Sequence, residues 1–229
     1  IGANPFKYGL IASTDTHLGT PGLVEEDGHP GHGGAGAPAT GALPRGLPDD
    51  LEFNPGGLAV LWAEENSRDS LFAAMRRREA YGTSGPRMVV RFFGGFDLPE
   101  DLCESDRFVE IGYRKGVPMG SDLRPGRGLA PRFAVWALRD PGTVTRPGTL
   151  LQHIQIVKGW VEDGEARERV YDVAGEAGNG ATVDLATCET AGPGAEHLCR
   201  VWTDPAFDPS ERAFYYARVL ENPTCRWSQ

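Results

Sequence analysis

The segment LLQHIQIVKGW, residues 150–160, has the residue alternation of a β-strand. Ile154 and Ile156 are each followed by a residue that points to the opposite face, as in a strand covered more on one side than on the other. Almost no helical periodicity separates this run from the similar ones around it. The pattern predicts a mainly antiparallel β-sandwich-like domain over residues 96–229. The other short runs rich in Val, Ile, Phe, Tyr and Trp are residues 131–138, 167–173, 198–204 and 213–220.

The first 95 residues combine helical and strand signals, which indicates an α/β segment. YGLIAS, residues 8–13, is apolar, brief and bounded by turn formers, so it predicts a short buried strand. Residues 58–78 are the clearest helical region, with a helix expected from about Ser67 to Glu79. Asn66 or Ser67 would cap its start, and three arginines suit its negative end. MVVRFFGG then predicts a strand.

Two residue types that bind metals follow the first predicted strand. Asp15 and His17 are two positions apart, so in an extended segment both side chains point to the same side. Divalent transition metals accept such oxygen and nitrogen ligands, and a bound metal lowers the pKa of its water. Short Asp-x-His motifs also occur by chance. On spacing alone, a turn-capping Asp15 and a hydrogen-bonded His17 remain the alternative.

Two further pairs have weaker metal or substrate signals. His29 and His32 form HPGH within residues 19–55, a Gly/Pro-rich stretch that predicts a long surface loop. They could close on a metal or be solvated loop residues. Glu64 and Glu65 precede the predicted helix, where carboxylates favour the positive end of the helix dipole. A role facing the substrate is the alternative for this pair.

Composition excludes several classes of protein. The chain of 229 residues has 23 Lys and Arg against 32 Asp and Glu, and its net charge of −9 argues against a nucleic-acid partner. No segment approaches the roughly 18 to 20 continuous apolar residues of a membrane span. A G-x-S-x-G elbow, a P-loop and a dinucleotide-binding glycine motif are all missing from the sequence. The chain begins with Ile and shows no leader, so we expect a part of a longer protein.

Cysteine content bears on the cellular compartment. The four cysteines lack any C-x-x-C pair, and their even number is compatible with two disulfides. Two disulfides would favour a periplasmic or secreted protein, whereas four buried thiols would favour the cytoplasm. The cysteines are Cys103, Cys188, Cys199 and Cys225.

Several long segments, in order along the chain, resemble the C-terminal part of the domain-of-unknown-function 3604 family. They include GLIASTDTH, AEENSRDSLFAAMRRREAYGTSGPR, GVPMGSDL, IQIVKGW and VWTDPAFDPSERAFYYARVLENPTCRWS. That family is similar to a branch of the PHP (polymerase and histidinol phosphatase) superfamily of metal-dependent hydrolases. The resemblance implies that residues 1–95 hold the end of a distorted β/α barrel with its long loop. Asp15 and His17 would match the last ligand motif of that barrel.

The resemblance also implies a reaction. A cluster of Zn, Mn or Fe ions would activate water and polarise a phosphoryl or carbonyl oxygen of a small-molecule substrate. The additional residues near the metal or substrate would be Ser13, Glu64, Glu65, His29 and His32. The early His-x-His of the superfamily does not occur in this chain. The remaining ligands would then come from the N-terminal half of the barrel, and the isolated chain would be inactive.

A different class of function stays open. Residues 96–229 could form a non-catalytic β-sandwich, acting as a binding or structural module of an exported protein. A weaker alternative makes the chain one piece of an oligomer, with its Gly/Pro loop wrapped around a neighbouring subunit.

Overall fold

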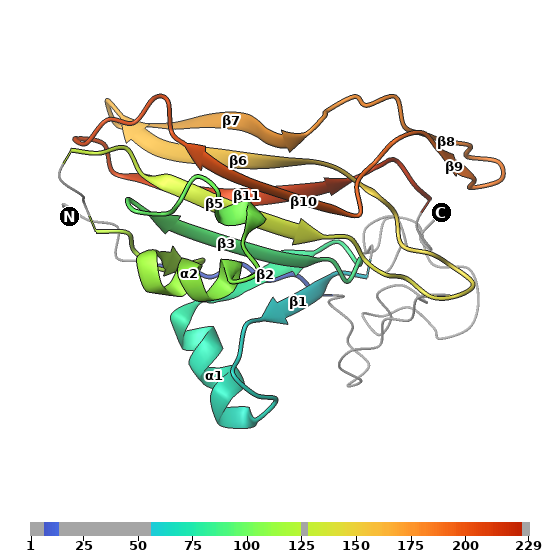
Figure 1. Cartoon of the computed structure of the whole chain (residues 1–229), viewed down its shortest axis with the longest axis horizontal. Helices are drawn as coiled ribbons and strands as arrows, with labels where there is room; N and C mark the ends of the chain where they lie inside the picture. Colours follow the sequence, from blue (N-terminus) through green and yellow to red (C-terminus); the bar gives the residue numbers. More distant parts are fainter. Residues whose placement is uncertain (1–6, 14–55, 125–127, 226–229) are drawn as a thin grey trace.

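Two antiparallel sheets account for most of the described structure (Figure 1). The computed structural model describes residues 7–13, 56–124 and 128–225. The four-stranded sheet has the order β10-β5-β3-β4, and the three-stranded sheet has the order β11-β6-β7. The predicted mainly antiparallel β-rich domain is therefore confirmed. The strands are β3 (Val89–Gly95), β4 (Val117–Pro118), β5 (Arg132–Leu138), β6 (Leu151–Glu162), β7 (Glu165–Gly175), β10 (His197–Thr203) and β11 (Ala213–Glu221).

The two sheets share one apolar core. Val90 and Phe92 of β3 pack with Val135 of β5 and with Ile154 and Ile156 of β6. Both isoleucines are fully buried, so the alternation in residues 150–160 predicted the covered face correctly. Burying one such side chain contributes roughly 1.5–3 kcal/mol. This shared core holds the sheets together as a sandwich.

A helical layer covers the other face of the four-stranded sheet. Alternation along β3 turns Phe93 away from the sandwich core, onto a second core with Leu98, Leu102 and Phe108. The covering elements are a 3-10 turn (Leu102–Glu104) and helix α2 (Phe108–Lys115). Helix α2 was not predicted, because it has only eight residues and no side-chain hydrogen bond caps its start. The missed signal is polar: Glu110 lies one helical turn from both Arg107 and Arg114 and pairs with each.

The N-terminal part of the chain forms a small α/β layer. Strand β1 (Leu58–Leu61) pairs antiparallel with β2 (Ala80–Thr83), and α1 (Arg68–Arg77) connects them. Ser67 caps α1 by accepting a hydrogen bond from the Ser70 amide at 3.3 Å, which confirms the predicted helix start. Residues 58–61 were wrongly included in the helical region. They pair with β2 instead, and the Ser67 cap begins the helix only after β1 has ended.

Residues 8–13 differ from the buried strand that was predicted. They form no strand, and Tyr8, Leu10 and Ile11 are 76, 68 and 64% exposed. The segment lies over the face of the β1–β2 pair and not along its edge: a Cβ on Gly82 would come within 2.6 Å of the Ala12 nitrogen. A segment that crosses the face of a sheet does not extend its hydrogen-bond ladder, so the apolar run forms no strand. Its apolar side chains are left on the outside.

Strand β3 connects the two halves of the sequence. It ends at Gly95, the last residue before the predicted boundary, and it pairs along its whole length with β5, which lies after the boundary. The division into residues 1–95 and 96–229 remains a prediction. A short hairpin, β8 (Thr182–Val183) and β9 (Thr190–Ala191), projects beyond the sandwich. Neither helix of the described residues has the length and hydropathy to cross a bilayer.

Candidate functional site

Of the predicted metal ligands and their neighbours, only Ser13, Glu64 and Glu65 lie within the described residues. Asp15, His17, His29, His32 and the predicted loop at 19–55 lie outside them. Among the described residues, no group of three or more His, Cys, Asp and Glu side chains is arranged to hold a metal ion.

Ser13 lies at one end of the α/β layer. Its main-chain oxygen is next to Gly57, directly before β1, and the neighbouring Ala12 packs against Gly82 of β2. Leu58 pairs with Thr83 at this same end of the two strands. The segment that leads to Asp15 in the sequence is therefore anchored on the β1–β2 pair.

Glu64 and Glu65 lie beyond the other end of β1. Their amides donate hydrogen bonds to Ser70 Oγ at 3.1 and 3.3 Å, and their carboxylates are exposed. Ser67, and not these acids, caps α1. The length of β1 separates the pair from Ser13, so the structure does not bring these predicted site residues together. The two glutamates instead line an open hollow with Ser70, Ala73 and Arg77.

Next to that hollow, polar and aromatic side chains gather where the α/β layer meets the four-stranded sheet. We call Trp62, Arg77, Glu79, Arg91 and Tyr113 the junction cluster. The Arg91 guanidinium carbon lies 3.2 Å from the centroid of the Trp62 ring, and Arg91 Nη1 is 3.2 Å from the Tyr113 hydroxyl. The Tyr113 hydroxyl donates to Glu79 Oε1, and Arg77 Nε is 3.4 Å from Glu79 Oε2.

Glu79 is the buried acid of this cluster. Only 3% of it is exposed, and a carboxylate so buried needs hydrogen-bond or charge partners, which Tyr113 and Arg77 supply. Burial, and then the hydrogen bond and charge of Glu79, raise the pKa of the Tyr113 phenol. The phenol therefore stays protonated and remains a donor to Glu79.

Two aromatic side chains attach the α/β layer to the open edge of β3. Tyr81 donates to the Met88 carbonyl at 2.9 Å and accepts from the Val90 amide at 3.2 Å. Trp62 Nε1 donates to the Val90 carbonyl at 3.1 Å. Beyond the two residues paired with β4, no strand of the described residues lies along this edge of β3, and the Tyr81 and Trp62 side chains give hydrogen-bond partners to its main chain.

A second charged group is buried between the two sheets. Lys158 of β6 is 2% exposed, with Nζ 3.2 Å from Asp204 and 2.8 Å from Glu211. It also donates to the Ala206 carbonyl at 2.7 Å, and the Tyr215 hydroxyl donates to Asp204 at 2.6 Å. Burial acts to lower the pKa of Lys158, but hydrogen bonds to Glu211 and Asp204 outweigh it and the pKa is raised. The ammonium stays charged and is no nucleophile.

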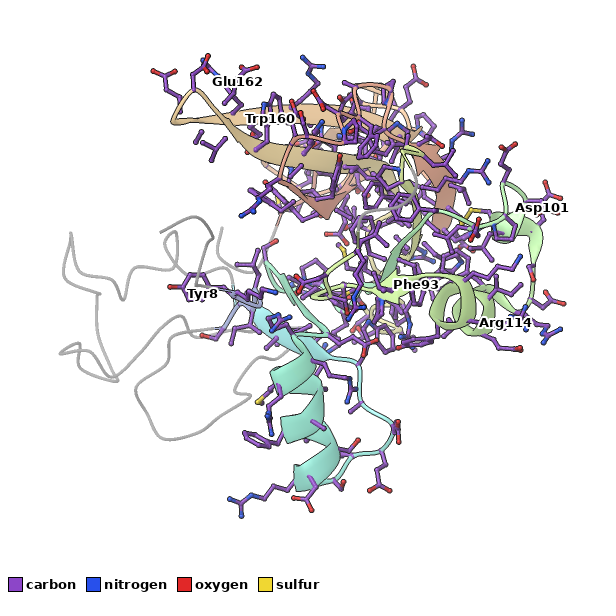
Figure 2. The ribbon with its side chains drawn as sticks, turned by 90° about the vertical axis from the view of Figure 1, so that its left-hand side faces the viewer. Tyr8, Phe93, Asp101, Arg114, Trp160 and Glu162 are labelled. Atoms are coloured by element: carbon purple, nitrogen blue, oxygen red, sulfur yellow. A yellow bond between two sulfur atoms is a disulfide. The ribbon has the colours of Figure 1, made fainter. Side chains whose placement is uncertain are left out.

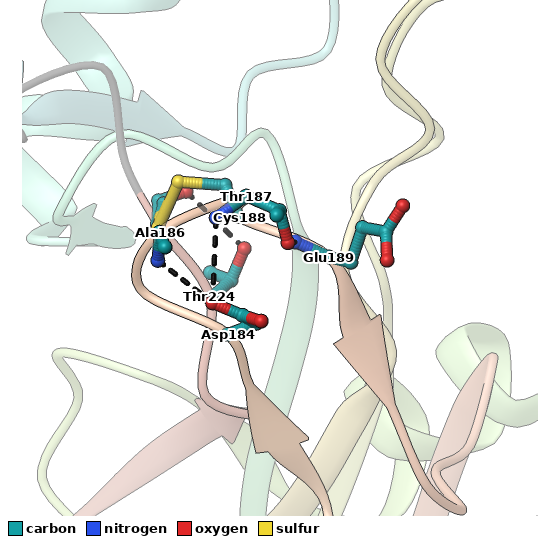
Figure 3. The surroundings of a disulfide bond; sticks show 7 residues. Asp184, Ala186, Thr187, Cys188, Glu189 and Thr224 are labelled. Atoms are coloured by element: carbon teal, nitrogen blue, oxygen red, sulfur yellow. Dashed lines mark hydrogen bonds between the residues drawn. A yellow bond between two sulfur atoms is a disulfide. The ribbon is translucent and has the colours of Figure 1, made fainter.

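Both pairs of cysteines form disulfides. Cys103, in the 3-10 turn, is joined to Cys199 of β10, and Cys188 is joined to Cys225. Figure 3 shows the second bond beside the turn that follows β8, where the amides of Ala186 and Cys188 donate to Asp184. The sequence left four reduced thiols as an alternative, and the structure has none.

Sequence reasoning missed most of these polar groups. Glu79, Arg91 and Lys158 were not singled out, because each lies in a segment whose pattern indicates only a helix end or a strand. One weak signal could have found Lys158. It lies on the same face of the strand as Ile154 and Ile156, so burial of those two residues implies burial of the lysine.

The described chain is thus a disulfide-linked antiparallel β-sandwich with an α/β layer attached at one sheet edge. A family model described as "Protein of unknown function (DUF3604)" matches residues 1–229. The chain belongs to this family, as its sequence segments indicated. Neither the curated proteins nor the solved structures gave a match.

Proposed function

We propose that the chain is the C-terminal portion of a metal-dependent hydrolase of the PHP type, acting on ester bonds of a small-molecule substrate. Asp15 and His17 would be two of its metal ligands. Catalytic metal sites use three or four protein ligands, so the others would come from an N-terminal half of the barrel. The chain alone would then bind metal poorly and hydrolyse nothing.

The observation that supports this proposal is an exposed apolar surface on the α/β layer. Besides Tyr8, Leu10 and Ile11, the helix α1 exposes Phe72 and Met75 by 60 and 56%. Figure 2 shows α1 projecting away from the two sheets, with Tyr8 on the side opposite to Arg114 of α2. Several large apolar side chains exposed on one small layer are more typical of an interface than single scattered ones. A further α/β layer, as in the rest of a barrel, would cover it.

The position of Ser13 fits the same proposal. Asp15 and His17 follow it by two and four residues, so the proposed ligands come directly after a segment anchored on β1 and β2. When bound, Zn, Mn or Fe would supply a water of lowered pKa and a Lewis acid for the substrate oxygen. Glu64 and Glu65, at the far end of β1, would have no part in this site.

Metal content and hydrolysis of the longer parent protein test the proposal. We expect Asp15→Ala and His17→Ala to lose bound metal and to lower hydrolysis of p-nitrophenyl phosphate or its diester at least 100-fold. Glu64→Ala is the matched control and should keep both. Unchanged metal content and unchanged hydrolysis in both ligand variants would refute the assignment.

A non-catalytic binding module is the second proposal, and a different surface favours it. On the outer face of the three-stranded sheet, Phe214 is 62% exposed, and its ring is nearly parallel to that of Tyr216, with centroids 6.3 Å apart. On the same face Gln155 joins Arg218 and Asp172 through hydrogen bonds. Flat aromatic surface beside planar polar groups suits an oligosaccharide.

Affinity electrophoresis through gels containing soluble polysaccharides such as xylan or β-glucan tests this second function. Phe214→Ala should abolish any retardation, whereas Phe72→Ala removes an equally exposed ring elsewhere and should not. If no polysaccharide retards the wild-type chain, the sheet face is not a glycan site.

We further infer that the protein is exported to the periplasm or the medium, with the cytoplasm as the alternative. The two disulfides support export, since such bonds persist in oxidising compartments. Trapping thiols with a maleimide at the moment of cell lysis should label none of the four cysteines. Labelling of all four would favour the cytoplasm.

A further inference from the structure

The junction cluster contains an arginine, Arg91, that pairs with no acid among the described residues. Trp62, Arg77, Glu79, Arg91 and Tyr113 line a hollow of about 380 Å³ together with Ala63 and Glu64. Within the described part of the chain, Arg91 contacts the Trp62 ring and the Tyr113 hydroxyl but forms no ion pair with a carboxylate. A partly buried guanidinium is thus held in place without a counter-charge.

Glu79, the acid of this cluster, already has partners for both of its carboxylate oxygens. Glu79 accepts from the Tyr113 hydroxyl through one oxygen and pairs with Arg77 through the other. The Tyr113 hydroxyl donates its hydrogen bond to Glu79, so it can only accept a hydrogen bond from Arg91. The hollow is therefore lined by two guanidinium groups, the buried carboxylate of Glu79 and the exposed carboxylate of Glu64, and among the described residues neither carboxylate pairs with Arg91.

The geometry of Arg91 suits an oxyanion. Contact with the Trp62 ring, 3.2 Å from the guanidinium carbon to the ring centroid, restricts the Arg91 side chain. Of the five donors that an arginine has, Tyr113 receives one. A planar guanidinium offers two parallel donors to a carboxylate or phosphate. Glu64 also lines the hollow, but its side chain is exposed and its charge is screened by water.

We propose that this hollow binds a small oxyanion, the carboxylate or phosphate group of a small-molecule ligand, through Arg91 with Arg77 beside it. The site lies beyond the end of β1 opposite to Ser13, and it requires neither a metal nor a hydrolytic reaction. It therefore stands or falls independently of the proposed function.

Calorimetric titration of the metal-free chain with inorganic phosphate and with acetate tests the site. Arg91→Gln should weaken binding of the preferred anion at least tenfold, as expected for the loss of a charge-assisted hydrogen-bonded pair. Arg91→Lys keeps the charge but loses the planar pair of donors, so its affinity for the anion should lie between those of the wild type and Arg91→Gln. Arg169→Gln is the matched control, because its guanidinium also lies over a tryptophan, 5.9 Å from the Trp160 ring, but outside the hollow.

Stability separates binding from a purely structural role of Arg91. Each variant is first shown to be folded by near-ultraviolet circular dichroism and thermal unfolding. If Arg91→Gln lowers the melting temperature while phosphate and acetate affinities stay as in the wild type, Arg91 only fastens the junction and the proposal is overturned. Absence of wild-type binding to both anions, or equal loss in Arg91→Gln and Arg169→Gln, overturns it as well.

Discussion

At the scale of single residues, two polar side chains contribute to stability through the partners that they hold. Lys158 and Tyr81 have different surroundings: the first is a charge between two sheets, and the second is a hydroxyl at a strand edge. In both cases the cost of a substitution comes from the partner groups that are left behind, since these cannot return to water.

Lys158→Met is expected to destabilise the fold by about 3–5 kcal/mol. The change removes the ammonium and leaves Asp204, whose side chain is fully buried, without its charged partner. Urea unfolding monitored by tryptophan fluorescence measures the difference. Lys115→Met replaces an exposed lysine at the end of α2 and should stay within about 1 kcal/mol of the wild type. Similar losses in both variants would contradict the role given to the buried charges.

Tyr81→Phe is expected to cost about 1–3 kcal/mol, because the Met88 carbonyl and the Val90 amide lose their shared partner at the β3 edge. Equilibrium unfolding by denaturant provides the measurement. Tyr216→Phe is the control, as this hydroxyl has no hydrogen-bond partner among the described residues. A Tyr81→Phe variant as stable as the control would mean that water replaces the hydroxyl.

At the scale of elements, local patterns predicted some parts well and others not at all. The Ser67 cap and the arginines in the last turn predicted α1, and the alternation around Ile154 and Ile156 predicted β6. Both signals are local, since a cap and a two-residue period depend only on neighbours in the chain. Helix α2 is packed through the flat surface at Gly112, a contact with Phe93 that no local pattern reveals.

Gly112→Ala tests that contact. A Cβ at this position would lie 2.6 Å from Phe93 Cδ2, so the helix and the sheet must separate or Phe93 must move. We expect a loss of about 1–3 kcal/mol, the usual cost of overpacking, despite the better helix propensity of alanine. Thermal unfolding of Gly112→Ala and of Ala73→Gly in α1 allows the comparison. A stabilised Gly112→Ala variant would show that α2 lies further from β3.

The bond between Cys103 and Cys199 acts at the same scale, since it joins the 3-10 turn to β10 across 96 residues of sequence. Replacing both cysteines by alanine should destabilise the protein by about 2–5 kcal/mol. The Cys188–Cys225 bond closes a shorter loop of 37 residues, so its removal should cost less in the chain-entropy model. Differential scanning calorimetry of the two double variants tests the order, and the reverse order would refute it.

At the scale of the whole molecule, the sequence predicted the class of fold but not the groups that meet inside it. Lys158 and Asp204 are 46 positions apart, and Trp62 and Arg91 are 29 apart. Such pairs come together only when two sheets pack or when a layer attaches to a sheet edge, and no periodicity encodes that. The predicted ligands Asp15 and His17 were found by the opposite route, from a short motif, and they remain a prediction.

Stability at alkaline pH follows from the interior as a whole. Burial raises the pKa of Tyr81, Tyr113 and Tyr215, and the hydrogen bonds to Glu211 and Asp204 raise that of Lys158 despite its burial. All four groups therefore hold their protons longer in the folded protein than in the unfolded chain, whose tyrosines and lysines titrate at about pH 10. Their stabilisation is complete below that pH and is lost as the pH rises toward the folded values.

We therefore expect the free energy of unfolding to be flat between about pH 8 and 9 and to fall above about pH 10. Tyr215→Phe removes one of the raised groups, so its stability should be lower at pH 8 but should decline less steeply above pH 10 than that of the wild type. Urea unfolding at half-unit pH steps gives both slopes. Equal slopes would mean that Tyr215 ionises as easily in the folded protein as in the unfolded chain, and that the sandwich interior near Asp204 is open to water.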